Sequence, residues 1–142
     1  MTTIAADAKA GLMASDSMWS DGDERGPIKK IHRVRGELIG LAGDLDQINL
    51  WLKVYRAGRL TDRPEKTAPD VDALRLSARG LDTWNRHEGW IPVPDRWAIG
   101  TGGKCARAAM AAGATAQRAV KIAIEIDANT NGTVRTYRLK AT

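Results

Sequence analysis

The chain is poor in the residues that form disulfides and metal sites. Among its 142 residues it has a single cysteine, Cys105, and only two histidines. An intrachain disulfide cannot form, so a reducing cytoplasm is the expected location. His32 and His87 are isolated from each other in the sequence, and no Cys, His and Asp residues have metal-site spacing. We therefore expect no metal and no other cofactor.

Long apolar runs are also missing. No segment approaches the ~20 apolar residues that a membrane helix needs, and the N-terminus does not have the pattern of a signal peptide. We expect no membrane partner. The length fits one domain with one core over residues 1–142. With 43% hydrophobic and 27% charged residues, this domain is expected to be globular and cytoplasmic.

A net charge of +5 raises the hypothesis of nucleic-acid binding, which would be salt-dependent. The densest basic stretch is residues 29–35, where basic and apolar residues alternate. This alternation is typical of a strand with one solvated side. The stretch has none of the interleaved aromatic residues that single-strand binding surfaces use, so no nucleic-acid partner is expected.

The hydrophobic pattern predicts strands, one helix, more strands, two helices and a final strand. Strands are expected over residues 2–8, 12–17, 28–34, 38–43, 71–78, 90–93 and 133–139. Helices are expected over residues 44–57, 104–112 and 116–127, the last with Thr115 as its N-cap. Residues 20–27 and 58–70 are expected to be loops, and residues 80–89 a turn. This order predicts an α+β fold with sheet inside and helices outside.

The predicted helix 44–57 is apolar nearly all round, which indicates burial on more than one side. Its main stripe is Leu45, Ile48, Leu52 and Tyr55. Its opposite side carries Leu50, Trp51 and Val54. In a chain this small, we expect one of these sides to face another subunit.

Thr2 directly follows Met1. Methionine aminopeptidase removes an initiator Met when the next residue is small, and Thr2 would then be the mature N-terminus. An N-terminal threonine combines a hydroxyl nucleophile with a free α-amine that can act as its base. The sequence therefore contains a candidate nucleophile, although many unrelated chains begin in the same way.

Three charged residues could each be either an ordinary solvated residue or a buried, partnered one. Asp127 falls on the apolar face of the last predicted helix, near its C-terminus, where a carboxylate needs a partner; the alternative is a solvated residue at a frayed end. Lys30 shares one side of its predicted strand with Ile28 and Val34, so it is either a buried cation or a snorkelling lysine. Asp16 ends a strand, where aspartate usually caps or turns.

Six short blocks, in this order, resemble those of the proteasome β-subunit family, and within it the bacterial heat-shock-locus peptidase subunits. The blocks are Thr2-Thr3-Ile4, Met13-Ala14-Ser15-Asp16-Ser17, Ile28-Lys29-Lys30-Ile31, Leu41-Ala42-Gly43-Asp44, Ile99-Gly100-Thr101-Gly102-Gly103 and Asp127-Ala128-Asn129-Thr130-Asn131. The resemblance implies a four-layer αββα sandwich of the N-terminal-nucleophile hydrolases. It also implies a threonine endopeptidase in a homo-oligomeric ring or stack, which acts on peptides or unfolded proteins and could be fed by an AAA+ ATPase.

The resemblance also implies a role for each matching residue. Thr2 would attack the peptide carbonyl, with Lys30 holding positive charge beside it and Asp16 pairing with Lys30. The backbone N–H of Gly43 would bind the oxyanion. The remaining implied site residues orient the N-terminal amine or line the substrate pocket. They are Thr101, Asp127 and Thr130 for the amine, and Trp19, His32, Leu41, Leu45 and Asn49 for the pocket.

Two departures from the family pattern bear on these roles. The connection over residues 58–71 is too short for the second outer helix that the family places there, which would leave Leu50, Trp51 and Val54 uncovered within the subunit. Asp44 adds a negative charge beside the oxyanion region, which would lower activity or change substrate preference. The alternatives are an inactive structural relative that retains Met1 and an amidase acting on a small amide.

Overall fold

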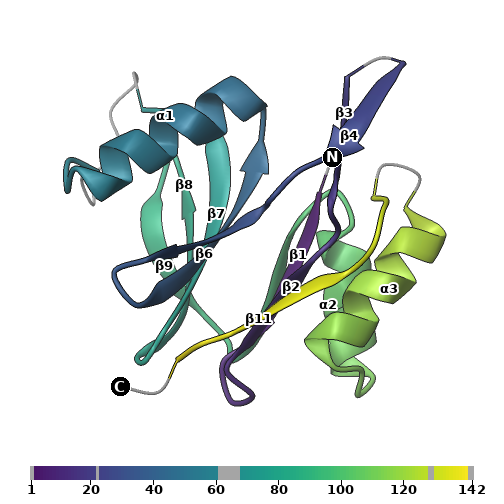
Figure 1. Ribbon diagram of the computed structural model, residues 1–142. Coiled ribbons are helices and arrows are strands. Elements are labelled where there is room, and N and C mark those ends of the chain that lie inside the picture. Colours follow the sequence, from purple (N-terminus) through teal and green to yellow (C-terminus); the bar gives the residue numbers. More distant parts are fainter. Residues whose placement is uncertain (1, 22, 61–67, 128–129, 141–142) are drawn as a thin grey trace.

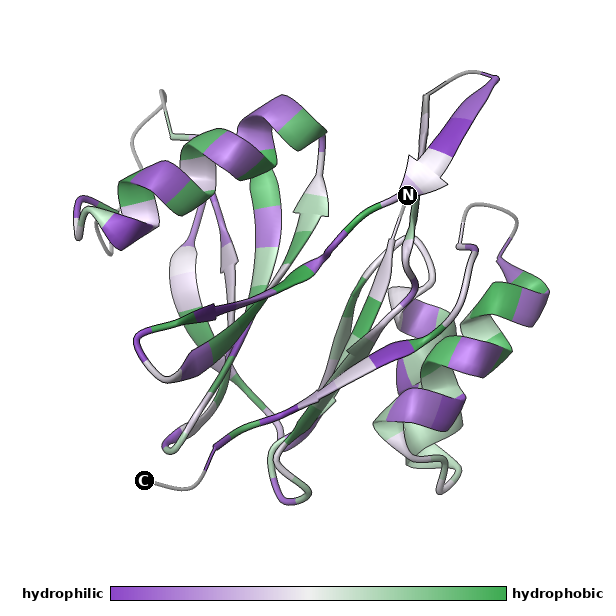
Figure 2. Ribbon diagram, viewed as in Figure 1, coloured by the Kyte–Doolittle hydropathy of each residue, from purple (hydrophilic) through white to green (hydrophobic). Residues whose placement is uncertain are grey.

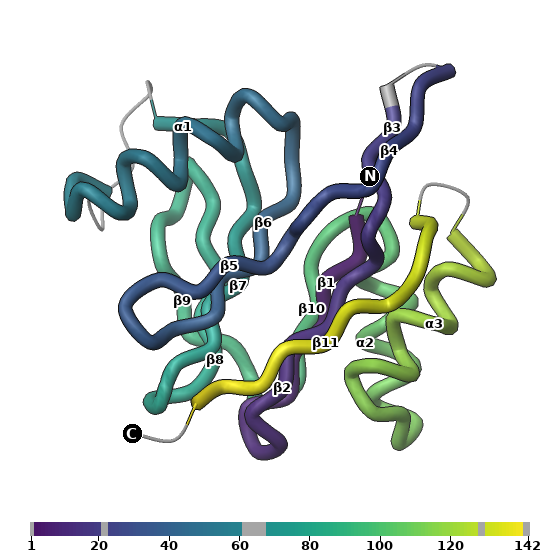
Figure 3. Tube along the Cα trace, in the orientation of Figure 1, coloured from purple at the N-terminus to yellow at the C-terminus, as the bar shows by residue number. Residues whose placement is uncertain are grey.

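The structure is a computed structural model that describes residues 2–21, 23–60, 68–127 and 130–140. Its first sheet has four strands in the order β10-β1-β2-β11, with all neighbours antiparallel. The strands are β1 (Thr3–Asp7), β2 (Leu12–Ser15), β10 (Arg96–Gly100) and β11 (Arg135–Arg138). The C-terminal strand β11 thus runs beside the N-terminal hairpin, as the tube in Figure 3 shows.

The second sheet is a five-stranded antiparallel meander in sequence order. Its strands are β5 (Ile31–Val34), β6 (Glu37–Gly43), β7 (Val71–Ser77), β8 (Gly80–Asn85) and β9 (Gly89–Val93). Buried side chains of both sheets meet in one apolar cluster, in which Ile4 and Met13 of the first sheet join Leu38 and Leu74 of the second. The two sheets therefore pack face to face, as a sandwich does.

In the described part of the chain, three helices cover the outer faces of this sandwich, as Figure 1 shows. Helix α1 (Leu45–Arg56) packs on the second sheet, whereas α2 (Gly103–Ala111) and α3 (Ala116–Ile126) pack on the first. Hydrophilic and hydrophobic residues alternate along α1 and α3 (Figure 2), as expected of helices with one buried face. The expected α+β layers, with the sheets inside, are confirmed.

For α1, the prediction that Trp51 lies uncovered was wrong, whereas Leu50 is exposed as predicted. Trp51 is completely buried and stacks on Tyr55, with Trp84 and Trp90 packed edge-on against its ring. Leu50 is 44% exposed, and Leu45, which belongs to the predicted main stripe, is 50% exposed. The large ring of Trp51 fills the space between helix and sheet, and this rotates Leu45 toward solvent. The predicted loss of a second outer helix stays a prediction, because residues 61–67 lie outside the described part.

Two segments expected to be irregular are strands. Residues 80–89 contain β8, in which Leu81 faces the other sheet and Trp84 faces α1. A strand buried on both faces shows no polar alternation, and its flanking glycines resembled turn signals. The predicted loop at 20–27 overlaps two paired strands, β3 (Met18–Asp21) and β4 (Glu24–Pro27), which project beside the start of β1 in Figure 1.

None of the helices that the structure describes is long and apolar enough to cross a lipid bilayer.

Candidate active site

Thr2 immediately precedes β1, a strand flanked on both sides by neighbours in the first sheet. Thr2 is only 7% exposed. Gly100, at the end of β10, packs directly against it: a Cβ on Gly100 would overlap the carbonyl carbon and oxygen of Thr2. Gly100 also has φ +93°, which L side chains rarely adopt. Only glycine therefore lets β10 hold the start of β1 this closely.

Asp16 and Lys30 form a buried ion pair beside Thr2. The Lys30 Nζ lies 2.9 Å from Asp16 Oδ2, and both side chains are almost fully buried. Two backbone N–H groups, from Thr3 and Asn131, also donate to the Asp16 carboxylate. Burial lowers the pKa of Lys30, while the charge of Asp16 opposes that shift. The pair therefore places a desolvated cation at this end of the sandwich.

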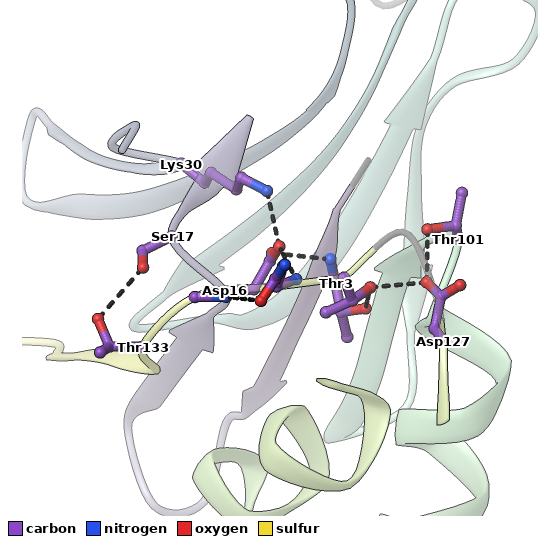
Figure 4. A network of polar contacts seen from close by, with 10 residues as sticks. Thr3, Asp16, Ser17, Lys30, Thr101, Asp127 and Thr133 are labelled. Carbon is purple, nitrogen blue, oxygen red and sulfur yellow. Dashed lines mark hydrogen bonds and ion pairs between the residues drawn. The ribbon is translucent and has the colours of Figure 1, made fainter. Parts of the chain in front are cut away.

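A second polar cluster lies on the other side of β1 (Figure 4). Asp127, the C-terminal cap of α3, accepts hydrogen bonds from the hydroxyls of Thr101 (2.8 Å) and Thr130 (2.6 Å) at Oδ2. Asp127 is thus not a solvated end residue. Thr130 is buried, and its hydroxyl lies 2.7 Å from Thr3 Oγ1. This cluster joins the start of β1 to the ends of β10 and α3.

One pocket of about 760 Å³ opens where these elements meet. Its lining includes seven of the predicted site residues: Thr2, Trp19, Lys30, Leu41, Gly43, Leu45 and Thr101. Asp16, Asp127 and Thr130 are not part of the lining, and they hold the lining residues through the contacts described above. The structure therefore brings together all seven residues to which the resemblance gave catalytic roles.

Two residues predicted to contact substrate lie elsewhere. Neither His32 nor Asn49 is part of the pocket lining. Asn49 is exposed on α1, and His32 lies on β5, close enough to Arg56 of α1 to be repelled by it. Burial, together with the charges of Lys29 and Arg56, lowers the pKa of His32 to about 4. The prediction continued the strand back through Lys30, which would put Lys30 and His32 on one face. In the structure β5 begins only at Ile31, so the alternation does not extend to Lys30.

Sequence reasoning missed two residues at this site. Thr3 is fully buried and contacts both polar clusters, while Asp72 lines the pocket from β7. The burial of Thr3 could have been predicted, because period-two alternation along the strand turns its side chain to the face opposite that of Thr2. For Asp72 the signal needed the sheet register, which pairs Asp72 with Ala42 and so brings it beside Gly43.

Among the described residues, no three His, Cys, Asp or Glu side chains lie close enough together to hold a metal ion.

Comparisons with known proteins support the fold. The eukaryotic HslV of Trypanosoma brucei superposes with a TM-score of 0.78 at 22% sequence identity, covering 99% of this chain and 100% of that chain. BPH of Thiobacillus denitrificans, solved alone and in complex with epoxomicin, superposes with a TM-score of 0.72 at 18% identity and the same coverage. No protein-family model and no curated protein sequence matches the chain. The chain therefore has the proteasome-like fold of the N-terminal-nucleophile hydrolases.

Proposed function

We propose that this chain is a threonine-type endopeptidase whose nucleophile is the hydroxyl of Thr2, freed by removal of Met1. The observation that carries the proposal is the position of Thr2. It lines the same pocket as Lys30, whose ammonium is ion-paired to the buried Asp16. A small buried hydroxyl beside a desolvated cation is the arrangement that activates such a nucleophile. The fold shared with HslV and BPH agrees with this chemistry.

In the proposed reaction, Thr2 Oγ attacks the carbonyl carbon of a peptide bond. The hydroxyl proton passes to the α-amine of Thr2, through a water molecule, and from there to the departing amine nitrogen. The C–N bond breaks and leaves an ester between the substrate acyl group and Thr2. A water molecule then attacks this ester, gives its proton to the same amine, and restores the free hydroxyl.

Two groups of the pocket would stabilise the charges that develop. Lys30 favours the alkoxide character of Thr2 Oγ because its ammonium lies in a desolvated setting. The backbone N–H of Gly43 would donate to the oxyanion. Gly43 has φ +148°, and a Cβ there would press on the backbone of Asp70 and Val71. Glycine at this position keeps β6 against β7 and leaves the pocket side open to a substrate.

We also propose that the chain acts as a homo-oligomeric ring or stack, which an AAA+ ATPase could supply with unfolded protein. Leu50, which is 44% exposed on α1 and lies outside the pocket lining, supports an interface there. This second part of the proposal is independent of the chemistry, and the native mass of the purified protein tests it. A mass that is a multiple of 15.4 kDa supports assembly, and a monomer at micromolar concentration contradicts it.

The chemistry is tested by the intact mass before and after incubation with epoxomicin, the compound bound in the solved BPH complex. An epoxyketone bridges the amine and the hydroxyl of an N-terminal threonine, so it requires both groups at one residue. We expect a chain that lacks Met1 and gains one epoxomicin adduct. A chain without Met1 that gains no adduct would contradict the proposed nucleophile. Retained Met1 would favour the inactive structural relative.

Acidic residues on one side of the pocket predict which peptides the protein cleaves fastest. Asp44, Asp46 and Asp72 all line it, and none has a cationic partner among the described residues. Asp72 lies beside Gly43 in the neighbouring strand, and partial burial together with the charge of Asp70 raises its pKa. We expect peptides with Lys or Arg next to the scissile bond to be cleaved faster than peptides with Gln there, because Asp72 would pair with the cation.

The prediction is measured as the ratio of kcat/KM for a lysine peptide and its glutamine counterpart. Asp72→Asn should lower this ratio about tenfold, the loss of one charge-assisted hydrogen bond. Asp95→Asn is the matched control: it makes the same change in net charge at a residue outside the pocket lining. A ratio that is equal in the wild type and in Asp72→Asn would show that Asp72 does not select substrates.

A further inference from the structure

Thr3 is completely buried, and each of its polar groups makes a hydrogen bond. Its N–H donates to Asp16 Oδ1 at 3.0 Å, and its carbonyl accepts from the Asp16 N–H at 3.2 Å. Its hydroxyl lies 2.7 Å from that of Thr130. Its backbone therefore contacts the Asp16–Lys30 pair, while its side chain contacts the cluster around Asp127 (Figure 4).

The direction of the hydroxyl contacts follows from the number of hydrogens. Asp127 Oδ2 accepts from both Thr101 and Thr130. A hydroxyl has a single hydrogen, so Thr130, which donates to Asp127, must accept from Thr3. The chain of donors thus runs from Thr3 through Thr130 to Asp127. Without the Thr3 hydroxyl, the buried oxygen of Thr130 loses its donor in this chain.

Gly102 shows how closely the protein is built around this hydroxyl. A Cβ on Gly102 would overlap Thr3 Oγ1 and would lie 3.2 Å from Thr130 Oγ1. The loop that carries Thr101 therefore passes directly over the Thr3–Thr130 contact. Thr3 is held by this loop, by Thr130 and by Asp16, and it is joined to Thr2 by one planar peptide bond. Any shift of Thr3 moves Thr2 with it.

From these contacts we propose that Thr3 is a positioning residue, which fixes the hydroxyl and amine of Thr2 between the Lys30 ammonium and the Asp127 cluster. The inference rests on the proposed function of Thr2 as nucleophile. Thr3 does not itself reach the pocket lining, so it acts only through the placement of its neighbour. A displacement of a reacting group by about 1 Å can cost a hundredfold in rate.

The test compares Thr3→Val, which keeps the shape but removes the hydroxyl, with Thr3→Ser, which keeps the hydroxyl. We expect Thr3→Val to lower kcat roughly thirtyfold to a hundredfold with KM changed less than about twofold, because the geometry of the reacting groups and not the pocket is altered. Thr3→Ser should recover most of kcat. If Thr3→Val does not fold, Thr3→Ala removes the same hydroxyl with less steric demand.

Ser17 provides a matched control. Its hydroxyl lies 3.2 Å from that of Thr133, in a second hydroxyl pair visible in Figure 4 that does not include Thr3. Ser17→Ala should leave kcat within about twofold, because it removes a comparable contact without moving Thr2. Full activity of Thr3→Val, or an equal loss in Thr3→Ser or Ser17→Ala, would overturn the inference.

A readout that needs no catalysis separates this inference from the proposed function. In threonine-methyl-labelled protein, the Thr2 methyl resonance should shift in Thr3→Val, return in Thr3→Ser and stay in place in Ser17→Ala. If the wild type neither cleaves peptides nor binds epoxomicin, the proposed function fails, and these shifts still decide whether Thr3 positions Thr2. An unmoved Thr2 resonance in Thr3→Val would overturn the inference, whatever the activity.

Discussion

Thr2→Ala is expected to abolish peptide hydrolysis and to leave the fold intact. The variant loses the only atom that forms the acyl-enzyme bond in the proposed reaction, so kcat should fall at least about a thousandfold. Alanine fits the space of threonine, and the close contact with Gly100 involves the Thr2 carbonyl, which the variant retains. The midpoint of thermal unfolding should therefore move by less than about 4 °C, equivalent to about 1 kcal/mol.

The measurement is hydrolysis of a fluorogenic peptide together with a thermal scan. Thr136→Ala is the control, because Thr136 is an exposed threonine of β11 outside the pocket. It should keep the wild-type kcat. Undiminished hydrolysis by Thr2→Ala would mean that another group is the nucleophile, and the proposed mechanism would then be wrong.

Lys30→Met is expected to damage both activity and stability, for two separable reasons. The neutral side chain no longer stabilises the developing alkoxide, which should lower kcat roughly a hundredfold to a thousandfold. It also leaves the fully buried Asp16 carboxylate with its backbone donors but without the ammonium. Breaking a buried pair in this way costs about 3 kcal/mol of unfolding free energy.

The double variant Asp16→Asn/Lys30→Met separates these two effects. Removing both charges relieves the uncompensated carboxylate, so we expect much of the stability to return while the activity stays lost. Denaturant unfolding and peptide hydrolysis are the two measurements. If activity returned along with stability, the role of Lys30 would be structural only. If Lys30→Met alone kept the wild-type kcat, the proposed charge stabilisation would be contradicted.

The same pair sets a pH dependence with a definite sign. Activity requires the charged form of Lys30, so it should fall as the pH rises through the Lys30 pKa. Burial already lowers this pKa, and the charge of Asp16 opposes the decrease. Asp16→Asn removes that opposition, so the alkaline decline of kcat should begin at a lower pH than in the wild type.

The sequence predicts which polar side chains the fold brings together better than it predicts how α1 packs. Thr2 and Lys30 directly precede strands, while Asp16 and Asp127 directly follow a strand and a helix, and the structure brings these ends together. Sequence patterns do not reveal residues that reach the site only through strand pairing. Asp72 lines the pocket because β7 pairs with β6. Hydrophobic periodicity also could not predict that Trp51 is buried, because α1 is apolar on several sides. The size of the indole ring decides which side is buried.

The pairing of β11 with β2 has a consequence for the order of synthesis. Thr130, and Asn131, which donates to Asp16, come shortly before β11 in the chain. A growing polypeptide therefore contains Thr2, Asp16 and Lys30 long before it contains the residues that complete their surroundings. In a chain that folds as it emerges, the proposed peptidase would stay incompetent until Thr130 and Asn131 had been translated and β11 could pair with β2. Half-made copies would then pose no proteolytic hazard to the cell.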